Sequence, residues 1–154
     1  MQGVYKNEFK RLLVAVDGSD NAIRAAKVAV SLAEKFGAEL IVCHVIPTPS
    51  YSLAQAGMVA TTILSDYFAA ARKDAKKTVD EAVRLAEIEG VKAIGVIHDN
   101  MFSVVEAIVN LAEEKNIDLI VIGTRGLTGF RKLLVGSVSS GVIAHAHCSV
   151  FIVR

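Results

Sequence analysis

The sequence predicts an α/β fold in which helices cover both faces of a parallel β-sheet. Two observations support this prediction. Short, continuous apolar runs alternate along the chain with longer segments whose apolar residues recur every three or four positions. The chain has 154 residues, of which 53% are hydrophobic and 21% charged, and this composition supplies one sizeable core. We therefore expect a single three-layer domain over residues 1–154.

The first half of the chain contains two predicted strands and two predicted helices. We expect strands at Phe9–Val16 and Glu39–Ile46, and helices at Asn21–Phe36 and Thr61–Glu89. Ser19 or Asp20 can cap the first helix, and Gly37 suits the left-handed position that follows its end. Pro47 should stop the second strand, because proline lacks the N–H that a sheet requires. The segment 50–60 is expected to be a loop.

The second half continues the alternation with three strands and two helices. We expect strands at Val91–Ile97, Ile117–Ile122 and Val150–Val153, and helices at Ser103–Lys115 and Val138–His145. Asp99 and Asn100 predict a turn after the third strand. Ser103 and Glu106 have the Ser-x-x-Glu spacing of a capping box, which marks the start of the helix that follows.

The predicted order of elements indicates a doubly wound, Rossmann-like sheet with five strands in the order 3-2-1-4-5. Right-handed crossovers leave few other topologies for alternating strands and helices. In such sheets, ligands bind beyond the carboxyl ends of the strands, where the strand order reverses. Here the reversal lies between the first strand, which ends at Asp17, and the fourth, which ends at Gly123. These two strand exits should therefore be neighbours.

Composition argues against several classes of partner. The 17 basic and 16 acidic residues give a net charge of +1, so neither a general nucleic-acid surface nor a membrane surface is expected. No apolar run approaches the roughly 20 residues of a membrane span. Cys43 and Cys148 lack the spacing of metal ligands, as do His98, His145 and His147. We expect reduced thiols, a cytoplasmic protein and no protein-bound metal.

A glycine-rich, basic stretch follows the fourth strand and leads into a serine-bearing helix. It contains Gly123, Arg125, Gly126, Gly129, Arg131, Lys132, Gly136, Ser137, Ser139 and Ser140. Glycines allow the backbone to approach a ligand closely, and a helix start offers unpaired N–H groups to an anion. Ser137 is also a suitable N-cap for this helix. The G-x-G-x-x-G and G-x-x-x-x-G-K-[ST] fingerprints are absent. The stretch therefore predicts an anion site of another kind.

The spacing Gly123-x2-Gly126-x9-Gly136-Ser137 resembles that of the universal stress protein family, whose ATP-binding members carry G-x2-G-x9-G-[ST]. Asp17-Gly18-Ser19, His44-Val45-Ile46-Pro47 and the closing strand at 150–153 also resemble the family. The resemblance spans nearly the whole chain. It implies a Rossmann-like fold and a regulatory or protective binding module of the stress response. The absence of a Walker-type lysine and of a positioned general base leads us to expect little or no turnover of the nucleotide.

The resemblance also implies a role for each matching residue. Asp17 would lie near the ribose or the phosphate–metal region, Val45 would present its backbone to adenine, and Ile122 would line the nucleoside with Gly123. The remaining positions would contact the phosphates: Arg125, Gly126, Gly136, Ser137, Val138 and Ser139. The implied ligand is ATP, or ADP or AMP, with Mg²⁺ held mainly by phosphate oxygens.

Two alternatives stand beside nucleotide binding without turnover. The first is a slow or partner-activated ATPase, although the sequence offers no Walker-type lysine and no second carboxylate beside Asp17 to act as a general base. The second is a dimeric scaffold with an unoccupied site. The nearly all-apolar strand Val150–Val153 should lie at a sheet edge, and such edges invite pairing. In the family, dimers pair through this strand across a two-fold axis, so we expect a homodimer.

Overall fold

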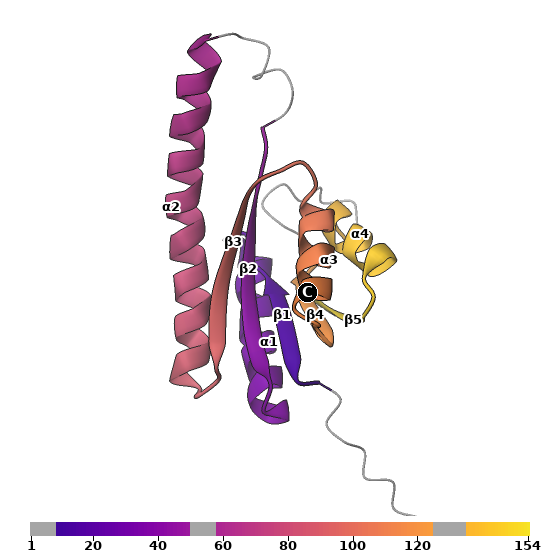
Figure 1. The fold of residues 1–154 in the computed structure, drawn as a ribbon. Coiled ribbons are helices and arrows are strands. Elements are labelled where there is room, and N and C mark those ends of the chain that lie inside the picture. Colours follow the sequence, from indigo (N-terminus) through magenta and orange to yellow (C-terminus); the bar gives the residue numbers. More distant parts are fainter. Residues whose placement is uncertain (1–8, 50–57, 125–134) are drawn as a thin grey trace, which may run out of the picture.

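The computed structural model describes residues 9–49, 58–124 and 135–154. Its strands form one five-stranded sheet in the order β3-β2-β1-β4-β5, and every neighbouring pair is parallel. The strands are β1 (Arg11–Ala15), β2 (Glu39–Pro47), β3 (Ala93–Met101), β4 (Leu119–Gly123) and β5 (Ser149–Val153). The predicted fold class and strand order are confirmed (Figure 1).

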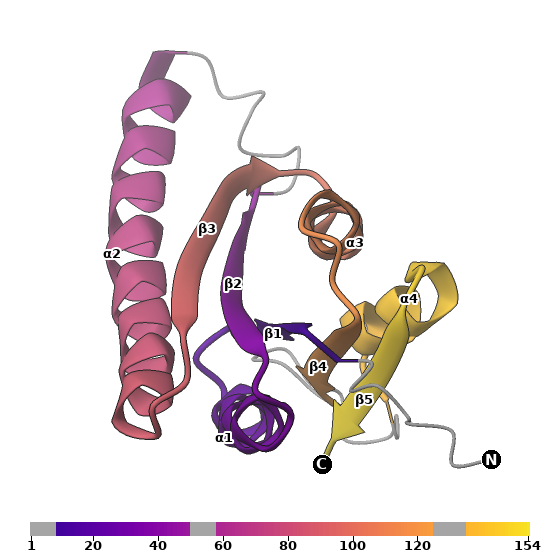
Figure 2. The same cartoon turned by 60° about the horizontal axis from the view of Figure 1, so that its bottom comes forward.

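Helices cover both faces of the sheet, which gives three layers. They are α1 (Asp20–Phe36), α2 (Met58–Ile88), α3 (Val104–Glu114) and α4 (Ser137–His145). α1 and α2 pack on one face, and α3 and α4 pack on the other (Figure 2). This division follows from the crossovers, because the chain moves from β1 to β3 in one direction and then crosses back to β4. None of the helices in the described ranges is long and apolar enough to cross a membrane.

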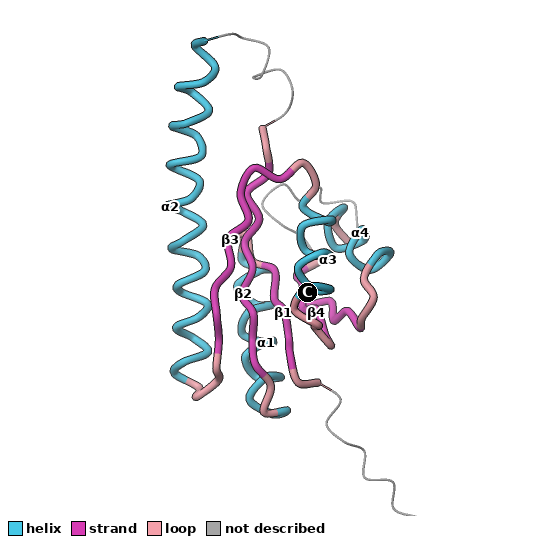
Figure 3. The backbone as a smooth tube through the Cα atoms, viewed as in Figure 1, coloured by secondary structure: helices cyan, strands magenta, loops and turns pink. Residues whose placement is uncertain are grey.

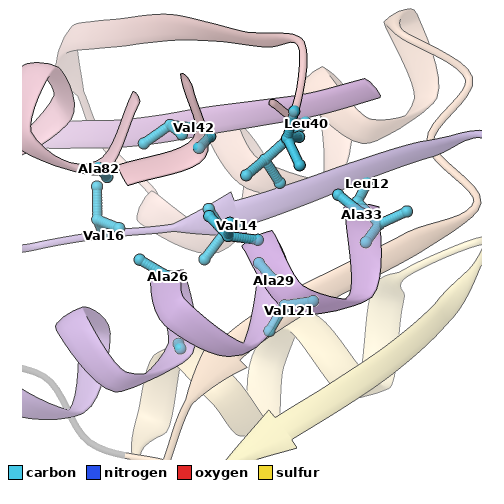
Figure 4. Packing of buried hydrophobic residues seen from close by; sticks show 14 of the residues in the cluster. Leu12, Val14, Val16, Ala26, Ala29, Ala33, Leu40, Val42, Ala82 and Val121 are labelled. Carbon is cyan, nitrogen blue, oxygen red and sulfur yellow. The ribbon is translucent and has the colours of Figure 1, made fainter. Parts of the chain in front are cut away.

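Small residues allow α1 to lie close to the sheet. Its buried face is made of Ala22, Ala25, Ala26, Ala29, Val30 and Ala33. These side chains pack against Leu12 and Val14 of β1 and Val121 of β4, all of which are fully buried (Figure 4). Burying one Leu or Val side chain stabilises the fold by roughly 1.5–3 kcal/mol. The centre of the sheet, beside the reversal of strand order, is therefore firmly held.

The opposite face has its own core beneath α3 and α4. Leu13, Ile41 and Ile120 contribute from the sheet, and Ile108 contributes from α3. Cys43 is also fully buried in this core. Burial raises the pKa of the Cys43 thiol to about 12, because the apolar surroundings disfavour the thiolate. Cys43 is therefore an inert core residue rather than a nucleophile.

Local sequence signals fix the ends of α1. The Ser19 side chain accepts a hydrogen bond from the N–H of Ala22 at 3.2 Å, as expected of an N-cap. Gly37 follows the helix with φ of +64°, a left-handed conformation that glycine adopts without strain.

The predicted start of α3 is also confirmed, because the Ser103 hydroxyl accepts a hydrogen bond from the N–H of Glu106.

The prediction for the end of β3 is wrong. Asp99 and Asn100 were expected to form a turn, whereas β3 continues through them to Met101. The reason is pairing with β2, which runs in register as far as Val45 and His98 and, after a register shift, joins Pro47 to Met101. Cross-strand pairing therefore outweighs the local turn preference of Asp and Asn.

Other element boundaries differ from the predictions by one to three residues. β1 and β4 are shorter than the apolar runs that predicted them, and β2 includes Pro47 at its end. α2 begins at Met58 rather than Thr61. Its 31 residues correspond to about 46 Å at the helical rise, whereas a nine-residue strand spans about 30 Å. The helix accordingly continues well past the ends of β2 and β3 (Figure 3).

Candidate functional site

The candidate site lies where β1 and β4 end side by side. The two strands pair through Leu12 with Leu119, Leu13 with Ile120 and Val14 with Val121. β1 leads to Asp17 and β4 ends at Gly123, both at the carboxyl edge of the sheet. The prediction that these strand exits are neighbours is confirmed. This edge is where doubly wound sheets bind ligands.

Asp17 is held in a tight turn between β1 and α1. One of its carboxylate oxygens, Oδ1, accepts a hydrogen bond from the N–H of Ser19 at 2.9 Å. Gly18 between them has φ of +83°, which residues with a side chain rarely adopt. The side chain of Asp17 is half-buried. The turn therefore fixes a carboxylate at the carboxyl edge of the sheet, beside the start of α1.

Gly123 lies against the first turn of α1. A Cβ atom at Gly123 would come within 3.0 Å of the backbone carbon and oxygen of Asn21. Since backbone atoms cannot move aside as a flexible side chain can, this close approach requires glycine. The neighbouring Ile122 is 5% exposed and packs in the core beneath α3 and α4. The exit of β4 is thus fixed in place by its packing.

The chain between β4 and α4 is closed at its base by backbone hydrogen bonds. The N–H of Gly136 donates to the carbonyl oxygen of Thr124 at 2.6 Å. The N–H of Thr124 in turn donates to the carbonyl oxygen of Val153 in β5 at 2.8 Å. Arg125 and Gly126, both predicted to contact phosphate, lie outside the described residues, as do Gly129, Arg131 and Lys132.

The start of α4 lies beside the exit of β4. Gly136 is the N-cap of α4, with an extended backbone, and Ser137 is its first helical residue. The prediction that Ser137 is the N-cap is therefore wrong, because the helix begins one residue earlier and glycine is itself tolerated at that position. In the described part of the chain, no side chain caps α4. Its first N–H groups are therefore left for solvent or a ligand.

Ser139 connects α4 to β4. Its hydroxyl donates a hydrogen bond to the carbonyl oxygen of Gly123 at 2.7 Å, and the residue is only 3% exposed. Ser137, by contrast, is exposed, and Val138 is half-buried. Of the two serine hydroxyls predicted to contact phosphate, the one at Ser139 is thus engaged with the sheet. The one at Ser137 faces solvent.

Two histidines flank Val45 at the same edge of the sheet. Val45 is half-buried, packs against the core beneath α3 and α4, and pairs with His98 of β3. By the alternation of side chains along β2, His44 points to the opposite face, beneath α1 and α2. Burial lowers the pKa of His44 below its usual range, because the charged imidazolium is disfavoured, and the charge of Asp17 partly opposes this.

Three residues that the sequence reasoning did not assign to the site contribute to its geometry. Thr124 is 5% exposed and bonds both β5 and Gly136 through its backbone. Asn21 forms the wall against Gly123. His98 carries a buried ring nitrogen, Nε2, that has no hydrogen-bond partner among the described residues. The position of Thr124 directly after Gly123 was a usable signal, whereas Asn21 and His98 reach the site only through tertiary packing.

Metal binding by side chains alone is not supported at this edge. Among the described residues, no three or more His, Cys, Asp or Glu side chains are arranged to hold a metal ion. A carboxylate such as that of Asp17 suits Mg²⁺ that is bound mainly through the phosphates of a nucleotide. The Asp17 carboxylate therefore fits an Mg²⁺ ion that is already bound to the phosphates of a nucleotide.

A separate pocket lies at the opposite edge of the sheet. It has a volume of about 640 Å³ and is lined by Phe9, Asn116, Ile117, Asp118, His147, Cys148 and Ser149. These residues precede or begin β1, β4 and β5, so the pocket lies at the amino ends of the strands. It is therefore distinct from the candidate site at the carboxyl ends.

Together, the fold and the site define a doubly wound α/β protein with an open helix start at the reversal of strand order. The model of the universal stress protein family matches residues 8–154. The chain therefore belongs to the universal stress protein family. It is 38% identical over 152 residues to Universal stress protein MJ0531 of Methanocaldococcus jannaschii, covering 97% of this chain and 84% of the relative. It is 35% identical over 150 residues to Universal stress protein YxiE of Bacillus subtilis, covering 95% of this chain and 99% of that relative.

Solved structures share the fold. Universal stress protein UspA from Lactobacillus plantarum superposes with a TM-score of 0.85 at 27% identity, covering 95% of this chain and 98% of that one. A universal stress protein in complex with cAMP superposes with a TM-score of 0.67 at 25% identity, covering 96% and 98%. The universal stress protein of Archaeoglobus fulgidus in complex with dAMP has a TM-score of 0.67 at 24% identity, covering 95% and 98%, a similarity that concerns the fold.

Proposed function

We propose that this chain is an adenine-nucleotide-binding protein of the stress response, a single cytoplasmic domain that regulates or protects by binding rather than by turnover. One observation carries the proposal most: Asp17, Gly123 and the open start of α4 meet at the carboxyl edge of the sheet. The complex of a related universal stress protein with cAMP supports an adenine nucleotide as the ligand. Cys43 and Cys148 are free thiols, as the cytoplasm would keep them.

Each part of the site has a proposed role. The N–H groups of Ser137, Val138 and Ser139 bind phosphate oxygens with the help of the helix dipole. Gly136 lets the phosphates approach the backbone, and Asp17 contacts the ribose or a phosphate-bound Mg²⁺. Arg125 and Gly126 add charge and backbone donors, an assignment that rests on the sequence motif. Ile122 and Gly123 line the nucleoside, and the backbone of Val45 contacts adenine.

Calorimetry with ATP, ADP and AMP in the presence of MgCl₂ tests this proposal directly. The wild-type chain should bind at least one of the three, and Gly136→Val should weaken binding at least tenfold. The added side chain would stand where the start of α4 meets the phosphates. Ala144→Val is the matched control, because it adds a branched side chain at an exposed position late in the same helix. The absence of binding by any adenine nucleotide at millimolar concentration would refute the proposal.

Turnover is the second quantity to measure. Asp17 is a carboxylate at the strand exits, where one of its oxygens accepts the N–H of Ser19, and the sequence offers no Walker-type lysine. We expect slow ATP hydrolysis at most, followed as phosphate release from the purified chain. Several turnovers per second would establish an ATPase instead.

A further inference from the structure

The outer edge of β3 presents backbone groups that can accept a further strand. β3 and β5 are the two edge strands of the described sheet (Figure 2). The N–H of Leu40 in β2 donates to the carbonyl oxygen of Lys92. In a parallel ladder, alternate residues of the neighbouring strand then direct their N–H and C=O groups outward, and in β3 these are Ala93, Gly95 and Ile97. Gly95 and Ile97 are both exposed, so this edge can be reached from outside the molecule.

The middle of this edge is apolar. Ile94 is 50% exposed on one face of the strand, and Ile97 is 37% exposed on the other. The run Ala93–Ile97 contains no charged residue and no proline, the residues that commonly protect edge strands from pairing. The charges at its two ends, on Lys92 and Asp99, are already paired with residues of β2 and α2. The edge therefore suits another uncharged, apolar strand rather than a charged peptide.

A second copy of β3 matches this edge in a symmetric register. A two-fold axis perpendicular to the sheet makes the two strands antiparallel, and outward-facing residues then pair with one another. With the axis at Val96, Gly95 of each copy lies opposite Ile97 of the other. Directly opposed side chains share a face, so the exposed isoleucine covers the exposed glycine, which has no side chain of its own. Each copy thus covers apolar surface of the other.

The position of α2 is compatible with this pairing. α2 packs on both β2 and β3, and so lies over the gap between these strands. In the paired arrangement, the same gap of the second copy is two strand spacings away, which is about 10 Å. Packed helices are usually about 8–10 Å apart. The two α2 helices therefore lie side by side at the distance of an ordinary helix contact.

A row of charged residues on α2 lies on the side of the helix that faces β3. Arg72 belongs to this side, because it forms an ion pair with Asp99 of β3. Lys76 and Asp80 follow Arg72 at intervals of four residues and so continue the row. Both are exposed, and they form an ion pair with each other at 2.7 Å. This flank of α2 thus carries one positive and one negative charge where a second α2 would pack.

The same two-fold axis makes these charges complementary between the copies. A side chain at Gly95 would collide with Val79 of α2, so Val79 lies directly over this part of β3. An axis at Val96 therefore passes close to the middle of the segment between Lys76 and Asp80. Because the two helices run antiparallel, Lys76 of each copy then faces Asp80 of the other.

We propose that the outer edge of β3 is an interface with a second copy of this chain, in which the β3 strands pair antiparallel about Val96 and the α2 helices pack beside them. The interface lies at the opposite edge of the sheet from Val150–Val153 and needs no nucleotide, so it goes beyond the proposed function. Its ion pairs lie at the surface and contribute little, so it should form at higher concentration than the pairing through Val150–Val153. Together, the two interfaces join dimers into tetramers and longer assemblies.

Sedimentation equilibrium of the Phe151→Glu chain isolates this interface, because that substitution opposes pairing through β5. The chain should be monomeric at low concentration and form dimers as the concentration rises towards the millimolar range. Adding Ile97→Lys places a charge on the outer edge of β3 and should weaken this association about tenfold or more. Adding Ile143→Lys instead, at an exposed position on α4, is the matched control and should leave the association unchanged.

Two charge variants test the register of the helices, again in the Phe151→Glu chain. Lys76→Asp leaves two negative charges on the flank of α2, and Asp80→Lys leaves two positive charges. Each variant alone should associate about fivefold or more weakly than the parent, because like charges then face each other across the axis. An equimolar mixture should regain the association as a heterodimer. Both variants lack the ion pair within the chain, so the recovery can come only from contact between copies.

The results decide the inference without reference to nucleotide binding. A Phe151→Glu chain that stays monomeric at millimolar concentration overturns it, as does a dimer that Ile97→Lys leaves intact. A mixture of the two charge variants that associates no better than either alone overturns the proposed register. Since a variant can fail to fold, hydrogen exchange of the Gly95 and Ile97 amides is also followed in the Phe151→Glu chain. Exchange should slow as the concentration rises, and rates that do not change would contradict the interface.

Discussion

Ser139 stabilises the junction between the sheet and α4 through its hydroxyl. That hydroxyl donates to the carbonyl oxygen of Gly123 in a buried position, where water cannot replace it. Ser139→Ala should therefore lower the free energy of unfolding by about 1–3 kcal/mol, measured by urea denaturation at fixed protein concentration. Ser140→Ala, at an exposed position of the same helix, should change it by less than about 0.5 kcal/mol. Equal effects of the two substitutions would contradict the structural role of Ser139.

His44 should make the stability of the protein depend on pH. Burial lowers the pKa of His44 in the folded state, so below the unfolded-state pKa of about 6.5 the unfolded chain binds more protons than the folded chain. The free energy of unfolding should then fall as the pH decreases from about 7 towards 5. In urea denaturation over this range, His44→Phe should show a weaker pH dependence than the wild-type chain. A dependence that is unchanged by the substitution would exclude His44 as its source.

At the scale of single elements, the two ends of α1 are determined by residues in or next to the helix itself. The sequence alone predicted its left-handed end at Gly37 and narrowed its N-cap to Ser19 or Asp20, of which the structure shows Ser19. Ser19→Ala removes the acceptor for the N–H of Ala22 and should destabilise the protein by about 1 kcal/mol in thermal or urea unfolding. Ser31→Ala, at an exposed position in the same helix, is the control and should have little effect. A comparable loss in both variants would mean that Ser19 contributes nothing as a cap.

The end of β3, by contrast, is not determined by local sequence preferences. Asp99 and Asn100 favour a turn by themselves, but β3 pairs with β2 on either side of them, at His98 and at Met101. The Asp99 carboxylate also forms an ion pair with Arg72 of α2, a contact between elements. The candidate site likewise has one part that the sequence predicts and another that depends on tertiary packing. The neighbourhood of Asp17 and Gly123 follows from topology, whereas the bond from Ser139 to Gly123 depends on how α4 is oriented against β4.

At the scale of the whole molecule, the two edges of the sheet differ. β3 at one edge is flanked by α2, whereas β5 at the other is a short strand that pairs only with β4 within the described sheet. Phe151 in β5 is 45% exposed. An open strand edge with an exposed aromatic residue is suited to pairing with a second copy across a two-fold axis. This supports the proposed homodimer through Val150–Val153.

Phe151→Glu tests that dimer. A charge on an edge strand opposes strand pairing, so the variant should be monomeric in light scattering at concentrations where the wild-type chain is dimeric. Ile143→Glu places the same charge at a comparably exposed position, 49% exposed, on α4 and should leave the dimer intact. A dimer that persists in Phe151→Glu, or a wild-type chain that is itself monomeric, would rule out this interface.

The hydrogen bond between Gly136 and Thr124 bears on how much a change in the length of the segment 125–135 would cost the fold. It closes the chain at the base of the segment 125–135, independently of that segment's sequence. The free-energy cost of joining the two ends of a chain segment rises only with the logarithm of its length, so a segment twice as long would cost about 0.6 kcal/mol more. The sheet and α4 therefore hold the two ends of the segment 125–135 together through backbone atoms alone.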